Sequence, residues 1–94
     1  MEFLVQIQVA LPAEMSDDER ARIHATELAR GRELLADGKI KAIWRVPGGL
    51  RNVGVWETAD ATELHRLIES LPLYRWLSAD VTPLAEHPLH GCGP

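Results

Sequence analysis

The sequence places its most reactive combination of side chains within one helical turn on either side of Glu27. On a helical wheel of about 100° per residue, Glu27 lies in an apolar arc between Ile23 and Leu34. Partial desolvation there raises a carboxyl pKa and makes the group a usable proton acceptor near neutral pH. Gly31, at i+4, leaves a notch for a small ligand, and His24, at i−3, is within reach of the carboxylate. The pattern predicts general-base chemistry; the alternative is a glutamate that only pairs with His24, Arg30 or a group on another element.

A second group of candidates flanks a Pro-Gly-Gly turn at residues 47–49. Arg45 and Arg51 could hold a carboxylate through paired hydrogen bonds, and Asn52 could donate a hydrogen bond to an oxyanion. Trp44 precedes this group and is a candidate contact for a small ligand. The alternative is a solvated hairpin edge with an ordinary aromatic core residue.

The remaining histidines and the cysteine predict no metal site and no nucleophile. His65 lies off the apolar stripe of its predicted helix, which favours a surface or capping role. His87 and His90 are three residues apart but have no third zinc ligand in register. The single cysteine, Cys92, excludes an internal disulfide and is expected to be a bystander thiol. No phosphate-binding glycine loop, nucleophile elbow or cysteine pair is present, so the sequence implies no cofactor.

Length and charge limit the class of protein. The chain has 94 residues, enough for one domain, which we assign to residues 1–88, with 89–94 as a flexible tail. Ten basic against fourteen acidic residues give a formal charge of −4, which argues against nucleic acid or an anionic membrane as the partner. No apolar run approaches the roughly 20 residues needed to span a bilayer, and no secretory signal opens the chain. We therefore expect a cytoplasmic protein.

The elements that must position these residues follow from periodicity and capping signals. Ser16 with Glu19, and Asp60 with Glu63, begin two helices, of which the first spans 17–36 and the second ends at Pro72. Pro83 suits an edge strand or a strand end. Alternating apolar and polar residues predict four strands, at residues 2–10, 39–46, 52–56 and 79–85.

This order is β-α-β-β-α-β, the α+β ferredoxin-like arrangement of a four-stranded antiparallel sheet with two helices on one face. The other face should carry Trp44 or Ile43, depending on register, and an apolar second face predicts burial against another subunit. Simple alternation groups Ile40, Ala42, Trp44 and Val46 on one face of their strand, opposite Lys41, Ile43 and Arg45.

Several short motifs follow one another in a specific order and spacing. They are Leu11-Pro12 with Met15, Glu27 in the first helix, Trp44-Arg45-Val46-Pro47-Gly48 followed by Asn52, Leu64-His65, Leu71-Pro72-Leu73, Pro83-Leu84 and His87-Pro88. In this order they resemble the muconolactone delta-isomerase family over about residues 1–88.

The resemblance implies a ferredoxin-like subunit in a ring-like homodecamer, with active sites lined by more than one subunit. It also implies cofactor-free movement of a double bond within a five-membered lactone, from muconolactone to 3-oxoadipate enol-lactone in the β-ketoadipate pathway of aromatic catabolism. On this basis Glu27 is the expected proton shuttle. Asn52 and His24 are candidate donors, and Arg45 or Arg51 is the candidate holder of the substrate carboxylate.

Two departures from the family pattern bear on the substrate. The family typically has a lysine directly after the helix glutamate, where this chain has Leu28. Its aromatic-proline-aromatic segment is Tyr74-Arg75-Trp76 here, and we expect Tyr74 to line the pocket or an interface. A related lactone is therefore a possible substrate. Two other functions compete: an oligomeric module that binds a small acid without turning it over, and a cofactor-independent oxygenase of the dimeric ferredoxin-like barrel type.

Overall fold

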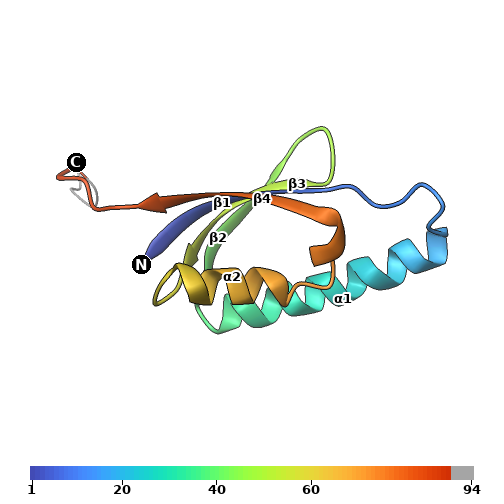
Figure 1. The fold of residues 1–94 in the computed structure, drawn as a ribbon, viewed down its shortest axis with the longest axis horizontal. Helices are drawn as coiled ribbons and strands as arrows, with labels where there is room; N and C mark the ends of the chain where they lie inside the picture. The colour runs from blue at the N-terminus through green and yellow to red at the C-terminus, as the bar shows by residue number, and fades with distance from the viewer. Residues whose placement is uncertain (90–94) are drawn as a thin grey trace.

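A computed structural model describes residues 1–89 as a four-stranded antiparallel sheet with two helices on one face (Figure 1). The strands lie in the order β2-β3-β1-β4. This arrangement confirms the predicted ferredoxin-like order. Two residues considered in the sequence, His90 and Cys92, lie outside the described residues. The elements are β1 (Glu2–Val9), α1 (Asp17–Ala36), β2 (Ile40–Val46), β3 (Arg51–Glu57), α2 (Ala61–Glu69), a 3₁₀ turn (Tyr74–Trp76) and β4 (Leu77–Leu84).

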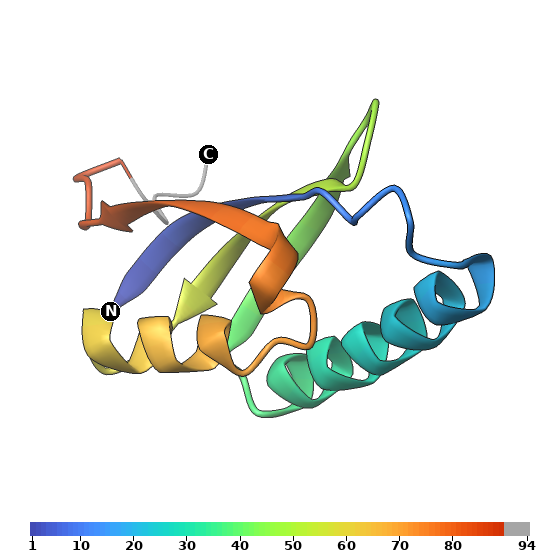
Figure 2. The ribbon, with the colours of Figure 1, turned by 45° about the vertical axis from the view of Figure 1, so that its right-hand side comes forward.

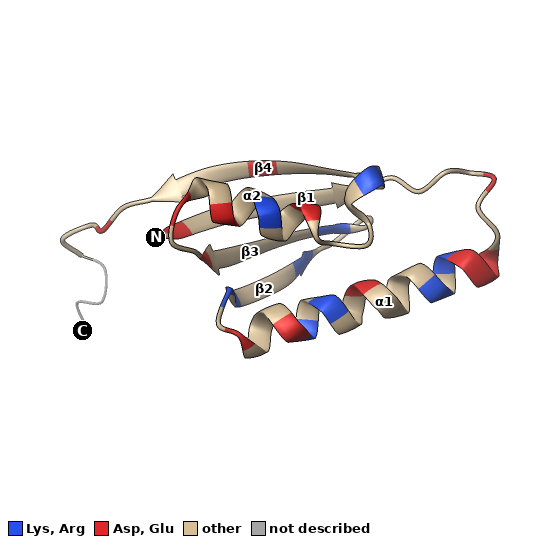
Figure 3. Ribbon diagram, turned by 60° about the horizontal axis from the view of Figure 1, so that its bottom comes forward, with Lys and Arg blue, Asp and Glu red and all other residues tan. Residues whose placement is uncertain are grey.

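Both helices begin at the predicted caps. The backbone N–H of Glu19 donates to Ser16 Oγ at 3.2 Å, and that of Glu63 donates to Asp60 Oδ1 at 2.8 Å. Acidic residues fill the first turn of α1, where the helix dipole favours negative charge (red at its N-terminal end in Figure 3). These contacts explain why both helices begin where predicted, and α1 also ends at Ala36 as predicted.

The sheet registers correct one prediction about β2. Ile40 pairs with Trp56, but the next pair is Ala42 with Val55, so Lys41 is an extra residue in a β-bulge. The bulge reverses the alternation after Ile40. Ile40 is therefore buried in the core and does not share a face with Ala42, as simple alternation had predicted.

Beyond the bulge, the registers show which residues of β2 face the helices. Ile43 pairs with Gly54, which also pairs with the buried Val5, so Ile43 lies on the helix side of the sheet. Trp44 is in register with Val53 on the uncovered face and is 57% exposed. The open choice between Ile43 and Trp44 is thus resolved in favour of Trp44.

The fourth strand begins two residues earlier than predicted, at Leu77, and forms a sheet edge beside β1. Pro83 lies in this edge strand, opposite Phe3, as expected for a residue that cannot donate a backbone hydrogen bond.

The hydrophobic core lies at one end of the sheet. Phe3, Val5, Leu34 and Trp56 have almost no exposed surface, and α2 adds Leu64 and Ile68. The C-terminal part of α1 joins this core, but its N-terminal part extends beyond the sheet (Figure 2). In the described part of the chain, no helix is both long and apolar enough to cross a membrane.

Candidate active site

A cleft of about 380 Å³ separates the middle of α1 from the hairpin end of the sheet. Residues of β1, β2 and β3 form one wall, to which the predicted ligand contact Trp44 contributes, and Leu73 closes one side. The other wall belongs to α1, whose contributions are His24, Glu27, Leu28, Gly31, Arg32 and Leu35. The cleft therefore includes the whole segment that the sequence marked as chemically promising.

Glu27 is a half-buried carboxylate in this cleft. Its Oε1 accepts a hydrogen bond of 3.0 Å from the backbone N–H of Leu73. Burial raises the pKa of Glu27, and this effect exceeds the lowering by the Leu73 N–H and by the charge of His24. The predicted rise in pKa is thus confirmed, and it makes the carboxylate a stronger proton acceptor.

The space beside Glu27 is open, as the notch prediction required. A Cβ built on Gly31 would meet no atom within 4 Å outside its own helix turn and chain neighbours. Arg30 is directed elsewhere, because its Nη2 and Nε donate to Ser70 Oγ at 2.9 and 3.1 Å. Arg30 is therefore not the partner of Glu27 that the alternative interpretation allowed.

Arg45 and Asn52 face the cleft from the sheet. They are register partners on β2 and β3, and Arg45 Nη1 donates to the backbone oxygen of Arg51 at 3.2 Å. Asn52 Oδ1 is buried without a hydrogen-bond partner among the described residues. A buried amide oxygen without a partner is unfavourable, and it is suited to accept a hydrogen bond from a polar ligand.

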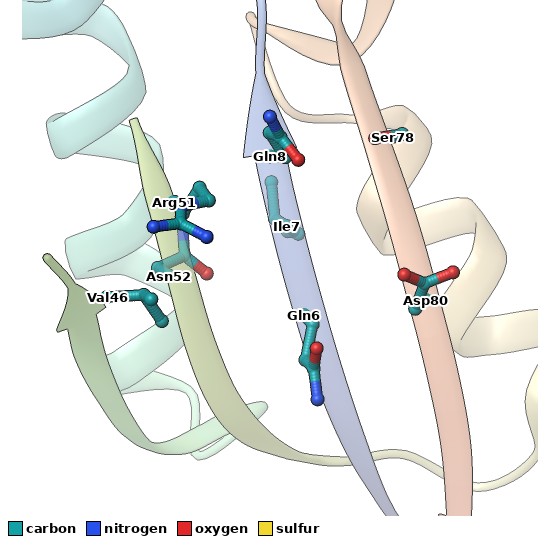
Figure 4. A pocket seen from close by; sticks show the side chains of 8 residues that line it. All are labelled: Gln6, Ile7, Gln8, Val46, Arg51, Asn52, Ser78 and Asp80. Carbon is teal, nitrogen blue, oxygen red and sulfur yellow. The ribbon is translucent and has the colours of Figure 1, made fainter. Parts of the chain in front are cut away.

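Arg51 lies outside this cleft, contrary to the expectation that it joins Arg45. Its Nη2 donates to the backbone oxygen of Pro47 at 2.6 Å, across the turn in which Gly48 has a positive φ of 100°. The guanidinium borders a smaller polar hollow on the uncovered face, with Gln6, Gln8 and Asp80 (Figure 4). Arg51 therefore stabilises the hairpin turn. The second arginine that lines the cleft beside Arg45 is Arg32 of α1.

Tyr74 also lies outside the cleft. It begins the 3₁₀ turn and is 39% exposed, whereas its neighbour Leu73 lines the cleft. His65 Nε2 lies 3.4 Å from Glu69 Oε1 on the exposed side of α2, which agrees with a surface role. Within residues 1–89, no group of three or more His, Cys, Asp or Glu side chains is arranged to hold a metal ion.

Sequence reasoning missed two groups that line the cleft. Arg32 lies about 140° from Glu27 on the helical wheel, at the margin of the arc, so its long side chain rather than its position brings it into the cleft. The backbone N–H of Leu73 meets Glu27 across 46 residues of sequence. A side-chain pattern contains no signal for such a backbone contact.

These features define a ferredoxin-like α+β protein whose cleft is lined by a half-buried carboxylate, two arginines and an amide. The family model described as muconolactone delta-isomerase matches residues 1–90, and the chain belongs to this family. It is accordingly an isomerase.

Curated relatives agree over nearly the whole chain. The chain is 35% identical over 88 residues to the muconolactone delta-isomerase of Acinetobacter baylyi, with 94% of this chain and 92% of the relative covered. It is 36% identical to that of Cupriavidus pinatubonensis, with 94% and 96% covered.

Solved structures show the same fold. A crystal structure of muconolactone isomerase superposes with a TM-score of 0.87 at 28% identity, covering 94% of this chain and 92% of that chain. The 5-chloro-2-hydroxyhydroquinone dehydrochlorinase of Burkholderia phenoliruptrix has a TM-score of 0.71 at 19% identity, covering 93% of this chain and 96% of that chain. At that identity the second likeness shows the fold alone.

Proposed function

We propose that this chain moves the ring double bond of muconolactone, or of a closely related lactone, with Glu27 as the proton shuttle. The observation that carries the proposal is the half-buried Glu27 carboxylate, whose pKa burial raises, on the wall of an open cleft. Family membership favours this reaction over the binding module and the oxygenase.

The reaction needs one base for two proton transfers. Ionised Glu27 removes the ring proton vinylogous to the lactone carbonyl, and the electron pair of that C–H bond moves into the ring to form a dienolate. Protonated Glu27 then returns the proton to the carbon next to the carbonyl, so the double bond shifts and the enzyme is regenerated. No redox step occurs, and atoms and charge balance within the lactone.

The dienolate requires hydrogen-bond donors at its oxygen, and the substrate carboxylate requires a cation. Asn52 and Arg45 are adjacent on neighbouring strands and line the same cleft, so they offer an amide and a guanidinium to the dienolate from one side. His24 interacts electrostatically with Glu27 from the preceding turn of α1. In our proposal its charge tunes the base.

The proposal extends to assembly and location. Trp44 and its partner Val53, together with the neighbouring pair Ala42 and Val55, form an apolar part of the uncovered face, which suits burial against another subunit. We propose a cytoplasmic homodecamer, in line with the family resemblance. Light scattering of the purified chain measures its molar mass and tests the assembly directly.

The experiment is a proton NMR time course with muconolactone in deuterated buffer. Glu27→Gln removes the base but keeps an oxygen that can accept from the Leu73 N–H, so the fold is retained. We expect turnover to fall about 10²- to 10⁴-fold. Glu14→Gln is the matched control, because Glu14 is exposed and lies outside the cleft.

Wild-type turnover in Glu27→Gln would remove Glu27 from the mechanism. If the unmodified protein binds the lactone saturably without converting it, the binding-module alternative holds instead. Oxygen uptake with a phenolic substrate would support the oxygenase.

A further inference from the structure

The arginines of α1 differ in how they are engaged (blue in Figure 3). Arg20 donates to the backbone oxygens of Pro12 and Met15, and Arg30 donates to Ser70 and Glu33. Arg32 lines the cleft and has no hydrogen-bond or ion-pair partner among residues 1–89. Its guanidinium is therefore available to a ligand.

The cleft has more positive than negative side chains. Arg32 on α1 and Arg45 on β2 supply two guanidinium groups, whereas Glu27 is the only carboxylate among the described residues that line it. Arg45 is already tied to the sheet through the backbone oxygen of Arg51. An anion that enters the cleft would therefore meet one arginine held at the sheet and one arginine on the helix whose guanidinium has no partner among residues 1–89.

The surroundings of Arg32 strengthen its interaction with an anion. Leu28 and Leu35 lie on the same arc of α1, and both are exposed although they line the cleft. A ligand between these leucines displaces water, and a charge-assisted hydrogen bond is stronger in the less polar surroundings that result.

The spacing along the helix suits a lactone with a short acidic arm. Arg32 follows Glu27 by five residues, which is a rise of about 7.5 Å along the helix axis. A five-membered ring at Glu27 with a two-carbon carboxylate arm spans a comparable length.

We propose that Arg32 binds the carboxylate of the substrate at the mouth of the cleft, which leaves Arg45 and Asn52 to face the lactone oxygens. This assignment rests on the proposed function. The arm points along α1, away from the base.

The test is a calorimetric titration with a saturated γ-lactone acetic acid and with its primary amide. Neither compound has a ring double bond, so binding is measured without turnover. Arg32→Gln should weaken binding of the acid about tenfold to a hundredfold and leave binding of the amide within about twofold. Arg32→Lys should retain part of the preference for the acid. Arg45→Gln should weaken binding of both compounds.

Arg66→Gln is the matched control, because it removes the same charge from the exposed side of α2, outside the cleft. It should change neither affinity. In turnover assays Arg32→Gln should raise KM at nearly unchanged kcat, because carboxylate binding is common to the ground state and the transition state.

The assignment is overturned if Arg32→Gln still binds the acid more tightly than the amide by the wild-type factor. It is also overturned if this preference is lost in Arg45→Gln and kept in Arg32→Gln. A wild-type protein that binds acid and amide equally also overturns it. The binding data do not depend on catalysis. A protein that prefers the acid through Arg32 but converts no lactone would refute the proposed isomerisation and leave the carboxylate site standing.

Discussion

The two ends of the sheet differ in how closely the helices cover the same strands. At one end, the start of β1 and the end of β3 bury Phe3 and Trp56 under α2 and the C-terminal part of α1. At the other end, Val9 of β1 and Asn52 near the start of β3 line the cleft beneath α1. One closed end supplies stability, and one open end holds polar groups that an ordinary core would exclude.

The two helices differ in the same way. Leu64 and Ile68 are buried on the nine-residue helix α2, whereas Leu34 is the only fully buried residue on the twenty-residue helix α1. Most of α1 is therefore not needed to cover the core. Its middle turns are available to present Glu27, Gly31 and Arg32 to a ligand.

The largest change in the free energy of unfolding is expected for a substitution at the closed end. Phe3→Ala should lower the free energy of unfolding by about 3–5 kcal/mol, because it leaves a cavity in a fully packed site. Leu28→Ala, at an exposed position of the open end, should change it by no more than about 0.5 kcal/mol. Urea denaturation followed by circular dichroism measures both.

Equal losses in the two variants would break the comparison. They would show that α1 is held in place by its exposed leucines, and that the cleft contributes to stability as the core does.

A loss of catalysis rather than of stability is expected for Asn52→Ala. Removal of an oxyanion donor should lower kcat about a hundredfold. The free energy of unfolding should change by less than about 1 kcal/mol, because Asn52 Oδ1 has no partner to lose. Gln6→Ala, which removes an amide from the uncovered face, should leave kcat unchanged. A large loss of stability at wild-type kcat would make Asn52 a structural residue.

Features that depend on local sequence were the more predictable ones, at both ends of the sheet. Local signals such as the Ser16 and Asp60 caps, the turn at Pro47 and the alternation of β1 depend on neighbours in sequence, and each is confirmed by the structure. The same locality made Glu27 recognisable, since a carboxylate inside an apolar arc is visible on a helical wheel.

Predictions that needed long-range information were less complete. The bulge at Lys41 depends on pairing with β3, so alternation alone assigned Ile40 to the wrong face. Arg51 and Arg45 are six residues apart on paired strands, but their register directs them to opposite faces of the sheet. The contact of Glu27 with Leu73 and the entry of Arg32 depend on how α1 lies over the sheet, which no local pattern specifies.

A smaller change in the free energy of unfolding is expected at Gly31, where a substitution should stabilise the helix but reduce the space for a ligand. Gly31→Ala should raise the free energy of unfolding by about 1 kcal/mol, because alanine favours the helix and its Cβ meets no other side chain. The added methyl group narrows the notch beside Glu27, so KM should rise. Gly38→Ala is the matched control, since its φ of +74° strains any L side chain and makes the same change destabilising. A Gly31→Ala variant with unchanged KM would show that the ligand does not use the notch.

The smallest expected effect concerns the stability that Glu27 costs the fold. Burial raises the pKa of Glu27 in the folded protein, so the protonated form is the better tolerated one. The penalty is absent below the ordinary carboxyl pKa, grows as pH rises through the raised pKa, and is constant above it. Glu27→Gln, which cannot ionise, should therefore be more stable than the wild type at neutral pH and equally stable in acid.

Urea denaturation of both proteins between about pH 4 and pH 8 measures this difference, and common acid effects cancel in the comparison. The kcat/KM of the wild type should fall with acidification over the same pH range, because only ionised Glu27 can accept the proton. A stability difference that grows toward low pH would mean that the Leu73 hydrogen bond and His24 outweigh burial. If the stability difference and kcat/KM change over the same pH range, one desolvated carboxylate both destabilises the fold and serves as the catalytic base.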